Sequence, residues 1–125
     1  MVSNNEQAVA FDFFVETELV SKEKFSIECK INKLLLKNAI DCDKITDNVT
    51  LRTREEGDTI KLCGRGTKTL KKLYNEARIP QEERSALPVA ADSLGVLWVC
   101  GVGVSQRVRV DKSTRNIMIF DVIKQ

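Results

Sequence analysis

The 125-residue sequence contains no histidine. A serine–histidine or cysteine–histidine dyad is therefore impossible within this chain. The four cysteines, at positions 29, 42, 63 and 100, include no CxxC pair, whereas zinc sites draw on closely spaced cysteine and histidine ligands. We therefore expect no catalytic residue, no metal site, no cofactor, and four free, buried thiols.

Long apolar runs are also missing, because no stretch approaches the roughly 20 residues of a membrane-spanning helix. The first ten residues lack the basic-then-apolar order of a signal peptide. The chain has two prolines and six glycines, with no internal repeat and no Pro/Gly/Ser-rich linker. These absences predict one cytoplasmic domain, residues 1–125, with no membrane partner.

Phosphate-binding glycine motifs and aromatic platforms are scarce as well. Two GxG fragments, at 64–66 and 101–103, extend neither to GxGxxG nor to a P-loop, so tight turns explain them better. Trp98 lies in an apolar run and is expected in the core, and Tyr74 at the edge of the core. Without aromatic side chains for base stacking, any nucleic acid bound here is expected to be a duplex contacted through its backbone.

The apolar pattern predicts an α+β fold: a single compact domain, mainly antiparallel, with one well-formed helix at about 68–78 and short helical turns. Thr67 or Thr69 is the expected N-cap of that helix, and Pro80 ends it. Short helical turns are expected at 41–45, capped by Asp41, and at 81–86, and a loop at 57–66. The predicted strands are 11–19, 25–31 (after a hairpin turn at 21–24), 49–53, 89–91, 96–100, 104–110 and 116–122.

Charge is distributed unevenly although the net charge is only +2. Residues 1–51 carry six Lys/Arg against nine Asp/Glu, whereas residues 52–125 carry fourteen against nine. Within residues 52–78 eight basic side chains face four acidic ones, a composition typical of a polyanion-binding surface. A solvated lysine face remains the alternative. The eight candidates for binding RNA are Arg52, Arg54, Lys61, Arg65, Lys68, Lys71, Lys72 and Arg78, with Lys68, Lys71 and Lys72 expected on one helix face.

Four motifs occur in order: R-x-R followed by GD in LRTREEGD (51–58), K-x-L-K-K in TKTLKKLYNEARIPQEERSALPV (67–89), an IP step leading to R-x-x-L-P in the same stretch, and W-V-x-G in LGVLWVCGVGVSQRVRV (94–110). Together with residues 39–45, they resemble the C-terminal domain of bacterial tRNA(Ile)-lysidine synthetases. The resemblance covers residues 39–122, which we take as the family-like core. Residues 1–38 are then expected to be leading β-strands packed on that core.

The resemblance implies a ligase that uses ATP to join lysine to the wobble cytidine of tRNA(Ile). That reaction belongs to an N-terminal PP-loop domain, whose SGGxDS motif is absent here. ATP and magnesium are therefore expected in that catalytic domain and not in this chain. In the family the C-terminal domain contacts the body of the tRNA, notably its duplex acceptor stem. The implied partners are tRNA(Ile) and the enzyme's own catalytic domain.

Several basic residues match the family's motif directly: Arg52, Arg54, Lys68, Lys71, Lys72, Arg78 and Arg84. Arg107 and Arg109, which follow the W-V-x-G strand, match less distinctly, and Arg107 is included among the candidates. Arg52 and Arg84 are equally candidates for structural ion pairs with Asp58 or Glu55.

A docking domain is the alternative function, in which the basic face packs on the parent enzyme or a second copy forms a homodimer. Such an interface needs an exposed apolar patch. Phe11, Phe13 and Phe14 are the expected source of that patch.

Overall fold

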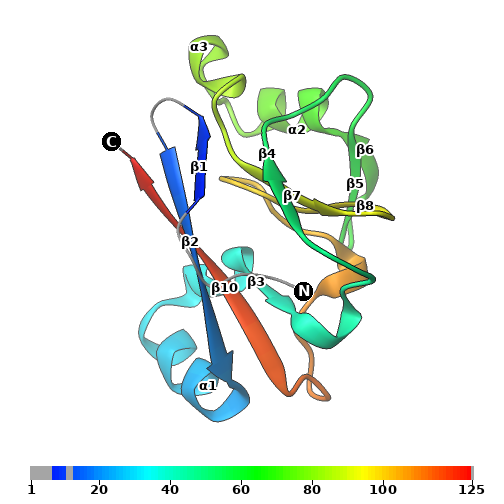
Figure 1. Cartoon of the computed structure of the whole chain (residues 1–125). Helices are drawn as coiled ribbons and strands as arrows, with labels where there is room; N and C mark the ends of the chain where they lie inside the picture. Colours follow the sequence, from blue (N-terminus) through cyan, green and yellow to red (C-terminus); the bar gives the residue numbers. More distant parts are fainter. Residues whose placement is uncertain (1–6, 11–12, 125) are drawn as a thin grey trace.

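A computed structural model describes residues 7–10 and 13–124 of the chain (Figure 1). Its α-helices are α1 (Lys22–Ile31), α2 (Leu70–Glu76) and α3 (Gln81–Arg84), and its 3-10 helices are η1 (Lys33–Asn38), η2 (Cys42–Lys44) and η3 (Gln106–Val108). Its strands are β1 (Gln7–Ala10), β2 (Phe13–Ser21), β3 (Ala39–Asp41), β4 (Thr50–Arg52), β5 (Thr59–Leu62), β6 (Gly66–Thr69), β7 (Val89–Asp92), β8 (Gly95–Val99), β9 (Gly103–Val104) and β10 (Asn116–Lys124). No helix in this part of the chain is long and apolar enough to cross a membrane.

The strands form three antiparallel sheets. Sheet A has the order β1-β2-β10-β3, sheet B has the order β4-β7-β8-β9, and β5 and β6 form a separate hairpin. Strands β2 and β10 are paired along their full length, from Asn116 opposite Ser21 to Lys124 opposite Phe13. This long pair brings the two ends of the described chain into one sheet.

The sheets are stacked in layers because each strand of the interior is apolar on both faces. In β10, Ile117 and Ile119 pack toward α1, whereas Met118 and Phe120 pack toward sheet B. The Trp98 ring of β8 stacks on Phe120 with centroids 4.5 Å apart and planes 10° from parallel. These contacts bury a continuous apolar layer between sheets A and B.

A β-bulge in sheet B adjusts which side chains reach sheet A. Ala90 is paired with Trp98, but Ala91 is paired with Val96, so Leu97 is the extra residue on β8. As a result Leu97 and Trp98 both pack toward sheet A, and Val96 contacts the opposite layer.

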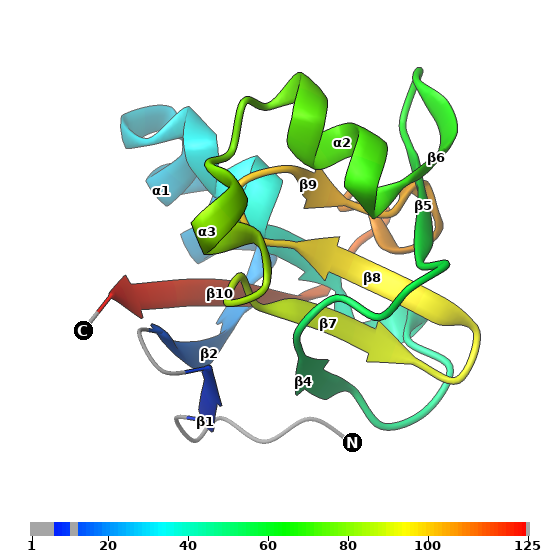
Figure 2. The ribbon, with the colours of Figure 1, turned by 90° about the horizontal axis from the view of Figure 1, so that it is seen from above.

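The opposite face of sheet B is covered by the β5–β6 hairpin and α2 (Figure 2). Ile60 and Leu62 from the hairpin, and Leu70, Leu73 and Tyr74 from α2, are buried against Val89 and Val99. Helix α2 begins where the Thr69 hydroxyl accepts the Lys72 N–H at 3.1 Å. Half of the ten candidate RNA-binding residues lie in this outer layer: Lys61, Arg65, Lys68, Lys71 and Lys72.

The sequence predicts much of this architecture correctly. The α+β class with mainly antiparallel pairing is confirmed. Trp98 is fully buried as expected, whereas Tyr74, expected at the edge of the core, is also fully buried. The Asp41 cap is also confirmed, because its Oδ1 accepts the Asp43 N–H at 2.9 Å at the start of η2.

The predicted strand at 25–31 is wrong, because this segment is helix α1, at ten residues the longest in the described chain. The Ser21 hydroxyl accepts the Lys24 N–H and starts the helix, so 21–24 is a helix cap and not a hairpin turn. Phe25 and Cys29, four residues apart, face inward, whereas Ile27 and Ile31 are 62% and 85% exposed. The alternation of apolar residues therefore does not correspond to a buried face.

Three further boundaries differ from the prediction. The expected loop at 57–66 contains β5, and the expected helix at 68–78 begins only at Leu70, which leaves Lys68 in β6. Of the expected strand at 104–110 only Val104 is in a strand, since Ser105 accepts the Arg107 N–H and starts η3. Lys68 is therefore not on a helix face with Lys71.

Candidate nucleic-acid interface

Six of the ten candidate residues are exposed, and apart from Arg65, which pairs with Glu76, they are Arg54, Lys61, Lys71, Lys72 and Arg78. Within the described part of the chain the side chains of these five form no hydrogen bond or ion pair. Arg54 lies in the β4–β5 loop, Lys61 on β5, and Lys71 and Lys72 in the first turn of α2. These are the basic groups that remain available to an outside anion.

Arg78 follows α2 and adopts a backbone conformation in which glycine is the usual residue. Its φ is +56°, the left-handed region, and it stands where a helix C-terminus commonly places glycine. A non-glycine residue there costs roughly 1–2 kcal/mol. The chain therefore holds an arginine, exposed, at a position where stability favours glycine.

Arg65 and Lys68 are held by one carboxylate. Arg65 Nη2 lies 2.7 Å from Glu76 Oε1, and Lys68 Nζ lies 3.0 Å from Glu76 Oε2. Hydrogen bonding from Lys68 is the main reason that the pKa of Glu76 lies below its ordinary value. These contacts connect the β5–β6 hairpin to the end of α2, so both cations are engaged in ion pairs within the domain.

Arg52 forms a two-pronged ion pair with Asp58. Its Nη1 and Nη2 donate to Asp58 Oδ2 at 2.7 Å and Oδ1 at 3.1 Å. Burial opposes ionisation of Asp58, but the hydrogen bonds from Arg52 and the Glu55 N–H outweigh it, so the pKa of Asp58 lies below its ordinary value. The structural alternative considered for Arg52 is confirmed.

Arg84 is also engaged, but not with either predicted carboxylate. Its Nε–H donates to the Ile79 carbonyl at 2.8 Å and its Nη1 donates to Asn75 Oδ1 at 2.6 Å. These bonds fasten the α2–α3 connection around Pro80. Pairing of Arg84 with Asp58 or Glu55 is therefore wrong, because its partners are Ile79 and Asn75.

Arg107 is bound by the most deeply buried carboxylate of the basic half. Its Nη2 and Nη1 lie 2.7 and 3.1 Å from the two oxygens of Asp92, whose side chain is fully buried. Asp92 also accepts the N–H groups of Thr46 and Leu94. These bonds join η3, the end of β7 and the loop before β4. Sequence reasoning missed Asp92 and Glu76, because neither stands at a helical spacing from its cation.

The free cations lie on two faces. On β5, Ile60 and Leu62 point into the core under α2, so Lys61 points to the other side of the hairpin. There Lys61 and Arg107 line a polar groove of about 350 Å³ beside the β7–β8 turn. Lys71, Lys72 and Arg78 lie on and after α2, and Arg54 lies in the β4–β5 loop, which the Asp58 carbonyl joins to the Leu70 N–H at the start of α2. We call these four residues the α2 face.

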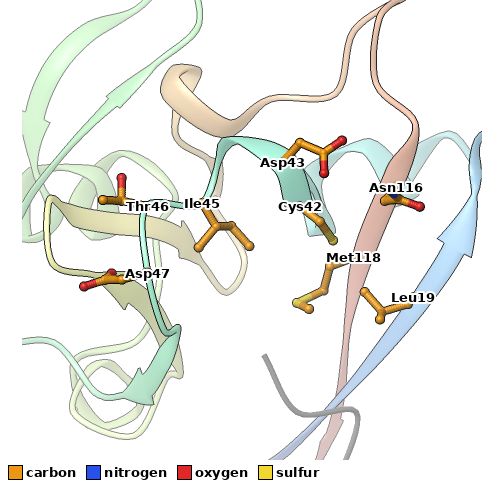
Figure 3. A pocket seen from close by; sticks show the side chains of 8 residues that line it. All are labelled: Leu19, Cys42, Asp43, Ile45, Thr46, Asp47, Asn116 and Met118. Carbon is orange, nitrogen blue, oxygen red and sulfur yellow. The ribbon is translucent and has the colours of Figure 1, made fainter. Parts of the chain in front are cut away.

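A larger cavity, of about 440 Å³, lies on a different part of the molecule (Figure 3). Its walls are mainly apolar, from Leu19, Ile45 and Met118, and Asp43 and Asp47 are at its rim. Carboxylates repel a phosphate backbone, so this cavity does not suit a nucleic acid.

The described residues hold no cluster of metal-binding side chains. They contain no group of three or more histidine, cysteine, aspartate or glutamate side chains arranged to hold a metal ion. The four cysteines are free. Burial is the main cause that raises the pKa of Cys42 and Cys100 to about 11, so both remain neutral thiols. The expectation of four buried thiols is wrong, because Cys29, Cys42 and Cys100 are half-buried and Cys63 is exposed. Cys63 accepts a bond from Arg109 Nη1 at 2.9 Å.

The fold is shared with a solved structure of known family. The chain superposes on the crystal structure of a TilS C-terminal domain with a TM-score of 0.75, covering 100% of this chain and 93% of that one at 23% sequence identity. An N-terminal fragment of the phenylalanyl-tRNA synthetase β-subunit from Pyrococcus horikoshii has a TM-score of 0.58, at 17% identity and 86% coverage of this chain. At these identities the likeness shows the fold alone.

Comparison of the sequence with known proteins identifies the family to which the chain belongs. A tRNA(Ile)-lysidine synthase of Caldanaerobacter subterraneus subsp. tengcongensis is 36% identical over 86 residues, which is 68% of this chain and 18% of that protein. The enzyme of the same name from Clostridioides difficile is 29% identical over 104 residues, 83% of this chain and 22% of that protein. The chain thus spans about a fifth of the length of these relatives. The family model described as the TilS substrate C-terminal domain matches residues 49–120, and the chain belongs to this family.

Proposed function

We propose that this domain binds tRNA through the α2 face, as the non-catalytic docking domain of an ATP-dependent ligase that converts the wobble cytidine of tRNA(Ile) to lysidine. One observation carries the proposal: among residues 7–10 and 13–124, five of the ten candidate cations are exposed and have no partner, whereas the others are held by carboxylates or by the backbone. Each unpaired cation that contacts a phosphate releases condensed counterions from the RNA, and this release contributes favourable binding free energy.

The domain's contribution to such a reaction is positional. Phosphate contacts along a duplex, the acceptor stem in our proposal, fix the orientation of the tRNA without reading its bases. The anticodon is then held where a distant active site can reach it. Lysine ligation, ATP and magnesium belong to the catalytic domain, which is the second proposed partner, in the cytoplasm.

The first test measures binding of the 125-residue chain to tRNA(Ile), to a tRNA of another type and to an acceptor-stem hairpin. Four phosphate contacts from the α2 face predict a loss of affinity of about 100-fold between 50 and 200 mM salt. We expect the hairpin to reproduce this loss. No binding to any of the three RNAs at low salt contradicts the proposal.

Arg78 provides a second test, because stability and binding are expected to change in opposite directions. Arg78→Gly relieves the left-handed backbone and is expected to stabilise the fold by about 0.5 kcal/mol, measured by urea unfolding. The same change removes one phosphate contact, so the salt slope of binding falls by about one. Arg78→Lys, which keeps the charge, is the control and retains the slope. An unchanged slope for Arg78→Gly removes Arg78 from the interface.

A docking function has its own supporting observation. Ile27 and Ile31 form an exposed apolar pair on α1, at the far side of sheet A from α2 (Figure 1). This face is the candidate surface for packing on the parent enzyme or for dimerisation. Of the phenylalanines proposed for that role, Phe11 lies outside the described residues, as do the side chains of Phe13 and Phe14. Concentration-dependent dimerisation abolished by Ile27→Ser/Ile31→Ser favours this second function.

A further inference from the structure

The carboxylate of Asp58 is the central acceptor of the β4–β5 loop. Its Oδ2 accepts Nη1 of Arg52, and its Oδ1 accepts Nη2. Oδ2 also accepts the Glu55 N–H at 2.8 Å. Arg52 Nη1 also donates to the Thr53 carbonyl at 3.0 Å. The Asp58 side chain is only 14% exposed and that of Arg52 only 25% exposed. The loop that carries Arg54 is therefore closed by one partly buried ion pair, in which two charge-assisted hydrogen bonds join Arg52 to Asp58.

The main chain of Asp58 connects the same loop to α2. Its N–H donates to the Glu55 carbonyl at 3.1 Å, closing a turn in which Gly57 has a φ of +88°. Its carbonyl accepts the N–H of Leu70 at 3.1 Å. Leu70 is the first residue of α2 and immediately precedes Lys71. One residue thus contacts both the loop of Arg54 and the start of the lysine-bearing helix.

Arg54 itself lies close to this junction. It lies four residues before Asp58 in the β4–β5 loop, and its charge helps to lower the pKa of Asp58. Within the described residues Arg54 forms no hydrogen bond or ion pair, and the buried Tyr74 hydroxyl has no hydrogen-bond partner. Among the described residues, the position of Arg54 relative to α2 therefore depends on the contacts of Asp58 that close this loop.

We propose that Asp58 is a positioning residue for RNA binding, which holds Arg54 in register with Lys71 and Lys72 although its own charge repels phosphate. The inference rests on the proposed function. A cation held in place loses less conformational entropy when it meets its phosphate than one on an open loop. The carboxylate therefore strengthens binding through Arg54, against the sign of its own charge.

The two possible roles of Asp58, positioning Arg54 and repelling phosphate, predict opposite changes in RNA affinity when its charge is removed. If net charge alone governed binding, replacing Asp58 by asparagine would remove a repulsive carboxylate and tighten binding. If Asp58 acts by holding Arg54, the same replacement weakens binding and lowers the salt slope by about one contact. Glu56, two residues earlier in the same turn, is exposed, and its side chain forms no hydrogen bond or ion pair within the described part of the chain, so Glu56→Gln is a matched control with the same charge change.

The experiment is a double-mutant cycle on the 125-residue chain with the acceptor-stem hairpin as probe. We expect Asp58→Asn to weaken binding about fivefold and Glu56→Gln to leave it unchanged or slightly tighter. In the Arg54→Ala background Asp58→Asn is expected to weaken binding no further, because the group through which it acts is gone. Circular dichroism establishes that each variant is folded.

Equal or tighter binding by folded Asp58→Asn overturns the inference and leaves the proposed function intact. So does a fivefold loss that persists in the Arg54→Ala background, since that loss would be purely structural. If Asp58→Asn does not fold, Arg52→Lys replaces it in the same cycle, because a lysine keeps the charge but cannot form the two-pronged pair. No hairpin binding by the unaltered chain contradicts the proposed function, and the inference with it.

Discussion

Reversing the charge of Lys71 and Lys72 together is expected to weaken RNA binding by about 100-fold or more. Both ammonium groups are exposed in the first turn of α2, and neither forms an ion pair within the described residues. Lys71→Glu/Lys72→Glu removes two phosphate contacts and places two like charges against the RNA backbone. The fold is expected to survive, because the buried side of α2 consists of Leu70, Leu73 and Tyr74. Affinity for the acceptor-stem hairpin as a function of salt measures the effect.

The matched control is Lys30→Glu/Lys112→Glu, which changes the net charge by the same four units. Lys30 is exposed on α1, and the carbonyl of Lys112 accepts a bond from Lys22 at the start of that helix. Helix α1 lies at the other end of the molecule from α2 (Figure 1), and the bond from Lys22 places Lys112 beside it. A loss confined to the α2 variant localises binding, whereas equal losses in both variants indicate that net charge alone attracts the RNA. Unchanged affinity of a folded Lys71→Glu/Lys72→Glu chain removes these lysines from the site.

The sequence predicts the fold well where burial is periodic on a long strand. Strand β10 is predictable because Ile117 and Ile119 face one apolar layer and Met118 and Phe120 face another. Helix α1 is not predictable in this way, because it has a single buried residue, Phe25, and exposes Ile27 and Ile31. Its own signals, a Ser21 cap and Glu23 in the first turn, are local and compete with a strong alternation of apolar residues.

The candidate site shows a different limit of sequence reasoning. Composition identifies which segment is basic, but it does not say which cations are already paired. Lys68 meets Glu76 only because β6 and α2 pack side by side, and Arg107 meets Asp92 across fifteen residues of chain. Only the fold decides that Lys71 and Lys72 remain free.

Arg107→Ala is expected to destabilise the domain by about 2 kcal/mol while leaving intrinsic RNA binding unchanged. Without the guanidinium, the fully buried Asp92 carboxylate keeps only the N–H groups of Thr46 and Leu94, and an uncompensated buried charge is strongly unfavourable. For a domain of this size the loss corresponds to a fall in Tm of about 8 °C. Thermal unfolding followed by circular dichroism measures it.

Two comparisons distinguish this structural role from the RNA contact that the motif implies. Adding Asp92→Asn to Arg107→Ala removes the unpaired buried charge and is expected to recover part of the stability. The recovery is only partial because the single carbonyl oxygen of asparagine can replace only one of the two Asp92 oxygens that accept the Thr46 and Leu94 N–H groups. Lys61→Ala, in the same groove but exposed, is expected to change stability by less than about 0.5 kcal/mol. Below its Tm, Arg107→Ala is expected to keep the affinity and salt slope of the unaltered chain, because both oxygens of Asp92 already occupy the guanidinium. A reduced slope with unchanged stability would instead place Arg107 against phosphate and show that RNA binding can break the Asp92 pair.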